Sequence, residues 1–352
     1  MNGTQTAPTA SGWPQDWKGT AATPISVDEA FNGYLAAQIV FALDRLGLLD
    51  QLLELGEVDV REFAARSGAD HRMLHELLRA AETCGYVAVR EGLAALTLAG
   101  REMARVRGYF TWAVGGYTEL FANIADIATG KRRFNHDVLR NEAMVALGSA
   151  QNDQAQLADT LDGVLADLDF TTIADLGSGI SARVCRVAAS REGVRGVGLD
   201  ISASANRLAA ETIRRAGLNG RVTALHRDIL DLVSGREHDA VLHEVDAVMS
   251  FFLMHDLLAD PNTRPQVLPR LREVFPKAHT FILADTMLRP ADAAGATLPV
   301  FSVGYELAHA IMGVPLHTQD AYEALFAQAG MCIRQVIPFG TPHSWLYVLE
   351  AD

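Results

Sequence analysis

The second half of the chain alternates short apolar runs with stretches of helical periodicity. The apolar runs predict five buried strands, at residues 171–174, 197–200, 222–225, 245–252 and 280–284. The periodic stretches predict helices between them, at residues 182–190, 204–216 and within 257–275. Strands that alternate with helices form a mostly parallel sheet that is covered on both faces. We therefore expect an α/β, Rossmann-like domain over residues 153–352.

The first half of the chain has mainly helical patterns. Ser26 and Glu29 predict a capping box, and an apolar stripe at helical spacing continues from there to Leu46. Residues 58–98 predict a winged helix, in which Asp70 caps the second helix and two strands pair across residues 91–93. We expect four parts: a flexible tail at 1–25, a mainly helical winged-helix domain at 26–110, linker helices or a lid at 111–152, and the α/β domain.

The charge of the chain restricts its partners. Lys and Arg number 30 and Asp and Glu number 43, which gives a net charge of −13. A chain this acidic is a poor general binder of nucleic acid or of an anionic membrane. The second helix of the winged motif has a mixed charge pattern, with Asp70, Arg72, Glu76 and Arg79, whereas a helix that reads DNA is expected to be basic. A winged-helix regulator with a ligand-sensing Rossmann-like domain is the alternative from another functional class.

Cysteine usage and hydropathy indicate a compartment. Cys84, Cys185 and Cys332 are far apart and odd in number, so they suggest neither a disulfide framework nor a Cys-x-x-Cys metal site. No apolar run approaches the roughly 20 residues of a membrane span, and the N-terminus lacks a signal-peptide pattern. We expect a cytoplasmic protein.

A nucleotide-type site is indicated where the first predicted strand ends. Gly177 and Gly179 allow a ligand to approach the backbone closely, and the following helix points free N–H groups at it. Asp200, about twenty residues further on, suits the two hydroxyls of a ribose, and Asp228 follows the third strand. We predict an S-adenosylmethionine site, with a dinucleotide site or an ordinary strand-to-helix turn as the alternatives.

Two histidines and an acid are candidates for the chemistry. His255 and Asp256 follow the fourth predicted strand, where an acceptor molecule is expected to lie, and Asp285 ends the fifth strand. His255 can act as a general base on a hydroxyl group, or it can bind a metal. With His309, from the apolar helical stretch 298–314, the pair forms a two-histidine, one-carboxylate set that suits non-haem iron. Asp256 would complete that set or orient His255 from outside it, and His309 could instead be a packed helix histidine.

Two other segments have open interpretations. Aromatic residues cluster between Gly108 and Phe121, which fits either a linker helix packed on both domains or a substrate pocket. The basic cluster Lys131–Arg133 fits a solvated loop, or it supplies an arginine for a substrate carboxylate.

The nucleotide-type motif resembles that of class I S-adenosylmethionine-dependent methyltransferases. The matching segments are Asp175–Gly179, Gly198–Asp200 and Arg227–Asp228. The resemblance implies that the glycine turn lines the methionine portion, with Asp200 on the ribose, Asp228 at the adenine amine and Ile229 on the adenine face. We also expect Asp175, Gly177, Gly179 and Phe251 in the cofactor site. From residue 26 to the end, the chain resembles plant-type O-methyltransferases, which implies that the winged-helix domain mediates homodimerisation.

A narrower resemblance points to the acceptor. Met254–Asp256, Leu298–Val314 and the aromatic cluster are similar to the 2-oxo acid (phenylpyruvate) C-methyltransferases of peptide-antibiotic biosynthesis. It implies ferric iron held by His255 and His309 and chelated by a 2-oxo acid, with Trp112, Phe301 and Tyr305 facing the substrate. The region 141–156 resembles 2-oxoarginine methyltransferases, so the substrate side chain stays open. The alternative is metal-free O-methylation of a small molecule with His255 as base.

Overall fold

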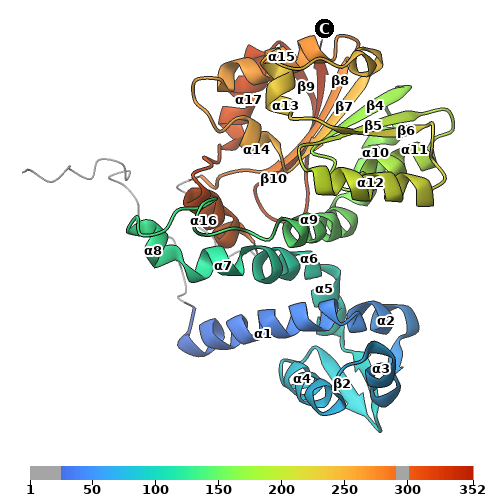
Figure 1. Ribbon diagram of the computed structural model, residues 1–352, viewed down its shortest axis with the longest axis vertical. Helices are drawn as coiled ribbons and strands as arrows, with labels where there is room; N and C mark the ends of the chain where they lie inside the picture. Colours follow the sequence, from blue (N-terminus) through green and yellow to red (C-terminus); the bar gives the residue numbers. More distant parts are fainter. Residues whose placement is uncertain (1–24, 291–300, 352) are drawn as a thin grey trace, which may run out of the picture.

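The computed structural model describes residues 25–290 and 301–351, and these form two domains with a layer of helices between them (Figure 1). The sheet domain lies at the top of Figure 1, the N-terminal domain at the bottom, and helices α6 to α9 run between the two. Apart from Ile25, the predicted tail 1–25 lies outside the described residues, as do residues 298–300 of the predicted helical stretch.

The N-terminal domain has the predicted winged-helix arrangement. Its helices are α1 (Val27–Arg45), α2 (Leu48–Leu55), α3 (Val60–Ser67) and α4 (His71–Thr83). Strands β1 (Glu57–Asp59), β2 (Val87–Arg90) and β3 (Leu93–Leu96) form an antiparallel sheet in the order β1-β3-β2. Both predicted caps are present: Ser26 and Glu29 form the capping box of α1, and Asp70 accepts a hydrogen bond from the Met73 amide at the start of α4. Local capping thus determines where both helices begin.

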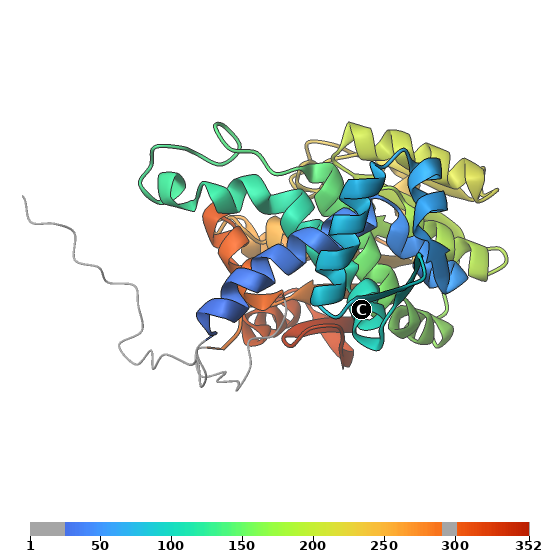
Figure 2. The ribbon, with the colours of Figure 1, turned by 90° about the horizontal axis from the view of Figure 1, so that it is seen from below.

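The middle layer consists of α5 (Leu98–Arg105), α6 (Arg107–Phe110), the π-helix η1 (Thr111–Gly116), α7 (Tyr117–Ala122), α8 (Ile124–Ala128) and α9 (Glu142–Gln156). Helix α1 crosses this layer, as the view from below shows (Figure 2). Gly148 of α9 packs directly on η1, where a Cβ atom would come within 2.7 Å of the Trp112 amide nitrogen and of the Gly108 carbonyl. This close approach fixes the position of Trp112 relative to α9.

The sheet domain carries seven strands: β4 (Thr172–Leu176), β5 (Arg195–Asp200), β6 (Val222–His226), β7 (Ala247–Phe251), β8 (Thr280–Thr286), β9 (Met331–Pro338) and β10 (Ser344–Ala351). Their order is β6-β5-β4-β7-β8-β10-β9. The first five are parallel, whereas β10 is antiparallel to both β8 and β9. The five predicted strands are all present, and the chain reverses its winding direction between β4 and β7, where such sheets bind ligands.

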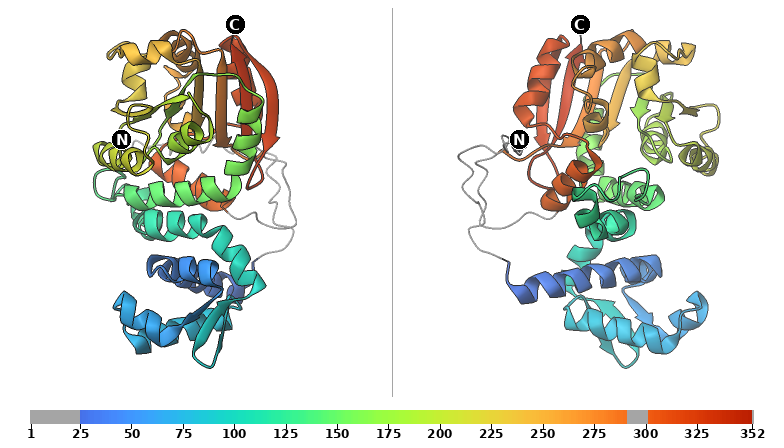
Figure 3. Two further views of the ribbon diagram at one scale, coloured as in Figure 1. Left: turned by 90° about the vertical axis from the view of Figure 1, so that its right-hand side faces the viewer. Right: turned by 60° about the vertical axis from the view of Figure 1, so that its left-hand side comes forward.

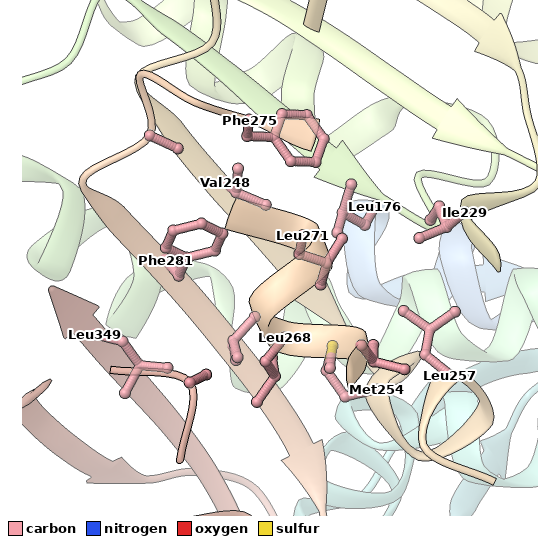
Figure 4. Close-up of a cluster of buried hydrophobic side chains, with 14 of the residues drawn as sticks. Leu176, Ile229, Val248, Met254, Leu257, Leu268, Leu271, Phe275, Phe281 and Leu349 are labelled. Atoms are coloured by element: carbon pink, nitrogen blue, oxygen red, sulfur yellow. The ribbon is translucent and has the colours of Figure 1, made fainter. Parts of the chain in front are cut away.

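Helices cover both faces of this sheet (Figure 3). The helices of this domain are α10 (Ala158–Ala166), α11 (Ala182–Ser190), α12 (Ala203–Arg215), α13 (Ile229–Val233), the 3-10 helix η2 (Ala240–Glu244), α14 (Met254–Leu257), α15 (Arg264–Val274) and α17 (Gln319–Gln328), whereas α16 (Ser302–Met312) lies below the sheet and packs against the middle layer (Figure 1). On one face, Leu268 and Leu271 of α15, and Phe275 directly after it, pack against Val248 and Phe281 of the sheet (Figure 4). Burial of such side chains contributes about 1.5–3 kcal/mol each. Within the described ranges, no helix has the length and apolar composition to cross a bilayer.

Candidate active site

The largest concentration of candidate residues lines a cavity of about 150 Å³ between the strand ends and the middle layer. The strand ends and their following segments supply its floor, and α6, η1, α9 and α16 supply its other walls. Its lining includes all six of the predicted catalytic and substrate residues, namely Trp112, His255, Asp256, Phe301, Tyr305 and His309. Segments that are up to 197 positions apart in the sequence therefore meet at one site, as the strand-end argument predicted.

His255 is held by the carboxylate of Asp285. Strands β7 and β8 are neighbours, so α14, which follows β7, lies beside the end of β8. The backbone N–H of His255 donates to Asp285 Oδ2 at 3.0 Å, and its ring Nδ1 lies 2.9 Å from Asp285 Oδ1. Nδ1 therefore carries the proton, and Nε2 is the ring atom left to face the cavity.

Asp285 is surrounded by hydrogen-bond donors. Besides His255, the hydroxyls of Tyr322 (2.8 Å) and Tyr305 (3.3 Å) and the Thr286 amide (2.9 Å) donate to its oxygens. Burial alone would raise the pKa of Asp285, but the charge and hydrogen bonds of His255, together with the hydrogen bond from Tyr322, outweigh it and hold the pKa below its usual value. The carboxylate is thus ionised, and, against the opposing effect of burial, it raises the pKa of His255.

The Nε2 atom of His309 points toward the Nε2 atom of His255. The Nδ1 atom of His309 lies 2.7 Å from the Tyr305 carbonyl, one turn earlier in α16, so Nδ1 is the donor. Burial, reinforced by nearby His255, lowers the pKa of His309 to about 3, and the ring is neutral. Its Nε2 therefore presents a lone pair, 3.1 Å from the Nε2 of His255.

This convergence suits a shared cation. Two neutral imidazoles with facing lone pairs repel, unless a proton on His255 or a metal ion lies between them. The two Nε2 atoms are 3.1 Å apart, so one ion bound at this point would be within reach of both. Each Nδ1 is also bound to an oxygen acceptor, as in typical metal-ligating histidines.

Asp256 does not complete a three-residue set. Its Oδ2 is 3.7 Å from His255 Nε2, and its side chain is 42% exposed. Among the residues that the structure describes, no three His, Cys, Asp or Glu side chains are grouped so that they could hold a metal. The facial set expected from residue types is therefore reduced to two histidines, and the carboxylate that orients His255 is Asp285 rather than Asp256.

Aromatic rings form a continuous wall of the cavity. Trp112 lies 4.9 Å from Phe301, and Phe301 lies 4.9 Å from Tyr305 and 4.8 Å from Tyr109, measured between ring centroids. Phe301 adopts a φ of 78°, which is uncommon for a large side chain and marks a constrained position. The cluster around residues 108–121 thus lines a pocket as well as linking the domains, although its Phe110 packs into the N-terminal core.

The cavity is also lined by Arg140, a positively charged residue that the sequence pattern did not indicate. Arg140 donates to the Tyr117 hydroxyl at 3.3 Å and contacts the sulfur of Met312 at 3.7 Å. Within the described chain, no carboxylate lies within ion-pair distance of it. The predicted basic cluster, 131–133, is exposed and pairs with neighbouring acids outside the cavity. No motif distinguishes Arg140 in the sequence, because the loop before α9 determines its position.

The predicted nucleotide-type site lies beside this cavity. Gly177 and Gly179 have φ values of 70° and 54°, and a Cβ at Gly179 would meet nothing within 4 Å, so its face is open. Asp200 ends β5 and accepts from the Gly179 and Ser202 amides, each at 2.8 Å. Asp228 follows β6 and caps α13. The glycine turn, Asp200 and Asp228 thus lie at the ends of three adjacent strands, β4, β5 and β6. This arrangement fits an adenosyl cofactor.

Three other predicted cofactor residues are buried. Asp175 is fully buried and pairs with Arg183 at 2.9 Å. Its burial raises its pKa to about 6, even though Arg183 opposes the shift. The Arg183 guanidinium also lies 4.1 Å from the ring centre of Phe251, which is 4% exposed, and Ile229 is 6% exposed. Asp175 and Arg183 support the turn from beneath.

The known proteins that are similar to this chain in sequence or in fold include methyltransferases. No family model matches the chain. Over 347 residues it is 27% identical to methyltransferase ungE' of Aspergillus campestris. The aligned region covers 95% of this chain and 98% of that protein. It is 25% identical over 307 residues to the 2-ketoarginine methyltransferase of Streptomyces arginensis, covering 85% and 86%. The mitomycin 7-O-methyltransferase MmcR has the same fold, with a TM-score of 0.61, 18% identity and coverage of 93% and 97%. Solved structures with this fold include forms with bound S-adenosylhomocysteine.

Proposed function

We propose that this protein, which its fold and its relatives identify as a class I S-adenosylmethionine-dependent methyltransferase of small molecules, methylates the β-carbon of a 2-oxo acid in secondary-metabolite biosynthesis. The observation that carries the proposal is the pair of Nε2 atoms of His255 and His309, 3.1 Å apart at the cavity wall. They would hold a ferric ion. When bound, such an ion supplies Lewis acidity that makes the β-hydrogens of a chelating 2-oxo acid more acidic.

The relatives support a 2-oxo acid as acceptor. One of them is by name a methyltransferase of 2-ketoarginine, which is a 2-oxo acid. A 2-oxo acid carries a carboxylate, and the cavity of this protein contains a guanidinium, Arg140, without a carboxylate partner among the described residues. Arginine pairs with carboxylates through two parallel hydrogen bonds. We therefore assign Arg140 to the substrate carboxylate.

We assign the role of proton acceptor to Asp256. Among the residues that the structure describes, it is the one Asp or Glu in the cavity lining, and its side chain is accessible from the cavity side of His255. A β C–H bond breaks and its proton moves to Asp256, while the electron pair attacks the methyl carbon of the sulfonium in line. The C–S bond then breaks and leaves neutral S-adenosylhomocysteine. Holding both partners near 3–3.5 Å could supply about 7–11 kcal/mol of the barrier.

The aromatic wall favours an aryl side chain on the acceptor. Trp112, Phe301 and Tyr305 present ring faces and edges within about 5–6 Å of one another, and such rings stack well on another aromatic group. An aryl 2-oxo acid such as phenylpyruvate would place its carboxylate toward Arg140 and its ring against this wall.

Metal-free O-methylation is the second candidate function. The Asp285–His255 pair would suit a general base for a hydroxyl group, because the carboxylate raises the pKa of the imidazole. Incubation with phenylpyruvate and methyl-labelled cofactor separates the two. Transfer to carbon gives a methyl NMR doublet coupled to the β-hydrogen. Transfer to oxygen gives an uncoupled singlet and would overturn C-methylation, as would activity on phenols but on no 2-oxo acid.

Removal of Arg140 tests the assignment of the carboxylate. In Arg140→Leu, we expect KM for the 2-oxo acid to rise about 10- to 100-fold, because a charged hydrogen bond contributes about 1.5–3 kcal/mol. Affinity for S-adenosylhomocysteine should be unchanged in a calorimetric titration. The matched control is Arg133→Leu, which removes an exposed arginine outside the cavity. An equal KM in both variants would contradict the assignment.

We also propose that the protein is a homodimer formed through its N-terminal domain. One side of α1 leaves Val27, Phe31 and Tyr34 more than 60% exposed, at helical spacing. Exposed apolar stripes of this kind mark interaction surfaces. Light scattering of the wild type should give about twice the mass of one chain. The Phe31→Glu variant should give the mass of a single chain. A wild type that stays monomeric at micromolar concentration would contradict the dimer.

A further inference from the structure

We propose that three buried hydroxyl groups, those of Thr286, Thr341 and Ser344, form a subsite for a hydrogen-bond donor at the far end of the acceptor's side chain. The preferred acceptor is then an aryl 2-oxo acid with an O–H or N–H group on its ring system, rather than one with a plain phenyl ring. The inference rests on the proposed function and adds the substituent that the cavity selects. All three residues line the cavity, and each is at most 6% exposed.

The fold of the sheet brings these three hydroxyls together. Ser344 begins β10 and pairs across the sheet with Thr286, the last residue of β8. The Ser344 hydroxyl lies 2.9 Å from that of Thr286 and 3.0 Å from that of Thr341, which belongs to the connection between β9 and β10. The Ser344 amide also donates to the Thr341 carbonyl, and the Ser344 carbonyl accepts from the Phe339 amide. Backbone hydrogen bonds thus hold the cluster in place.

Packing does not account for these hydroxyls. The next side chains on the same face of the two strands are apolar, namely Ile282, Ala284, Leu346 and Val348. A buried hydroxyl costs free energy compared with an apolar group of the same shape, unless it forms hydrogen bonds. Each bond within the cluster uses one lone pair, whereas every hydroxyl oxygen has two. Acceptor capacity therefore remains unused at the cavity wall, and a ligand O–H or N–H group is its complement.

The order of strands places the cluster on the acceptor side of the cavity. The glycine turn, Asp200 and Asp228 of the predicted cofactor site follow β4, β5 and β6. The hydroxyls belong to β8, β10 and the β9–β10 connection, beyond β7 from that site. A ligand group that contacts them therefore comes from the acceptor rather than from the methyl donor.

The aromatic wall leads from the histidine pair to this cluster. The Tyr305 hydroxyl lies 3.1 Å from His255 Nδ1, and the ring of Phe301 contacts the rings of both Tyr305 and Tyr109. A Cβ atom on Gly340, directly before Thr341, would lie 3.6 Å from the Tyr109 hydroxyl. An acceptor with its 2-oxo acid group at the histidines and its ring along this wall thus points the far end of the ring at the hydroxyls.

Turnover of three acids tests the subsite. The ring of 4-hydroxyphenylpyruvate carries an O–H donor, that of indole-3-pyruvate carries an N–H donor, and phenylpyruvate has neither. In the wild type, we expect kcat/KM for one of the first two acids to exceed that for phenylpyruvate at least about tenfold, because a site built for a hydrogen bond discriminates against an analogue without the group. The better of the two shows whether the donor is oxygen or nitrogen. In Thr286→Val and Ser344→Ala, the preference should fall below about threefold.

The matched control is Thr280→Val, since Thr280 is buried on the same face of β8, at its opposite end and outside the cavity. This variant should keep the wild-type preference. Equal kcat/KM values for the three acids, or a preference that survives both hydroxyl deletions, would overturn the subsite and leave C-methylation of a 2-oxo acid standing. Turnover of none of the three would overturn the proposed function, and this inference with it. The comparison of acids in the wild type does not depend on how any variant folds.

Discussion

If His255 and His309 hold iron as proposed, replacing His309 with alanine is expected to abolish iron binding and to lower kcat by more than about 100-fold. The loss of an outer-shell partner alone costs about 10- to 100-fold in metal affinity or activity, and this variant removes one of the two proposed protein ligands. Metal analysis of protein purified without chelator, together with turnover of an aryl 2-oxo acid, measures both effects. We expect this because the ring of His309 is neutral and its proton is on Nδ1, so that Nε2 carries a lone pair that can bind a metal.

His317 provides the matched control for this variant. It is half-buried, bonds the Leu258 carbonyl at 3.3 Å and lies outside the cavity lining. His317→Ala should keep its iron and most of its activity. Binding of S-adenosylhomocysteine should be retained in both variants, which shows that they are folded. If His309→Ala keeps full activity and merely melts at a lower temperature, the histidine is a packing residue and the metal proposal fails.

Asp285→Asn is expected to reduce kcat/KM by about 10- to 100-fold and to lower the melting temperature. The carboxylate accepts from the backbone and ring of His255, from two tyrosine hydroxyls and from the Thr286 amide. An amide would direct its own N–H groups at one of these donors and would no longer fix the imidazole. Breaking a buried charged pair costs about 3–5 kcal/mol, so thermal unfolding should detect it easily.

Asp246→Asn separates stability from catalysis. Asp246 accepts hydrogen bonds from the Thr171 and Thr172 amides, at the opposite end of β4 and β7 from the cavity. Its replacement should lower the melting temperature but leave kcat and iron content near the wild-type values. Equal kinetic losses in the two variants would mean that Asp285 acts through global stability, and its positioning role would be wrong.

The α/β domain was predictable because buried parallel strands are continuous apolar runs that alternate with amphipathic helices. Ser26 and Asp70 were likewise predictable as caps, since capping is a local interaction. The assignment to S-adenosylmethionine-dependent methyltransferases is confirmed by the relatives and the fold. Strand β9 was not predicted, because most of it is exposed at the sheet edge and shows no continuous apolar run. Strand β10 was also not predicted, although it is a mostly buried apolar run between β8 and β9.

The details of the site depended on spatial neighbours that sequence spacing does not encode. Asp285 was recognisable as a strand end, but its bond to His255 follows from the adjacency of β7 and β8. Asp256, adjacent in sequence to His255, was the natural candidate for that role, yet its side chain is 42% exposed. Arg140 reaches the cavity only because of how residues 129–141 fold. Pairing across a sheet and loop conformation are tertiary properties, and no local pattern reports them.

Iron analysis combined with a phenylpyruvate titration tests the proposed two-histidine iron centre most directly. Protein purified without chelator should contain about one iron per chain, and phenylpyruvate should produce or shift a ligand-to-metal charge-transfer absorption band in the wild type but not in His309→Ala. A wild type that binds S-adenosylhomocysteine, yet takes up no iron after incubation with ferric ion and shows no spectral change, would contradict the iron centre. His255 would then act as a metal-free general base.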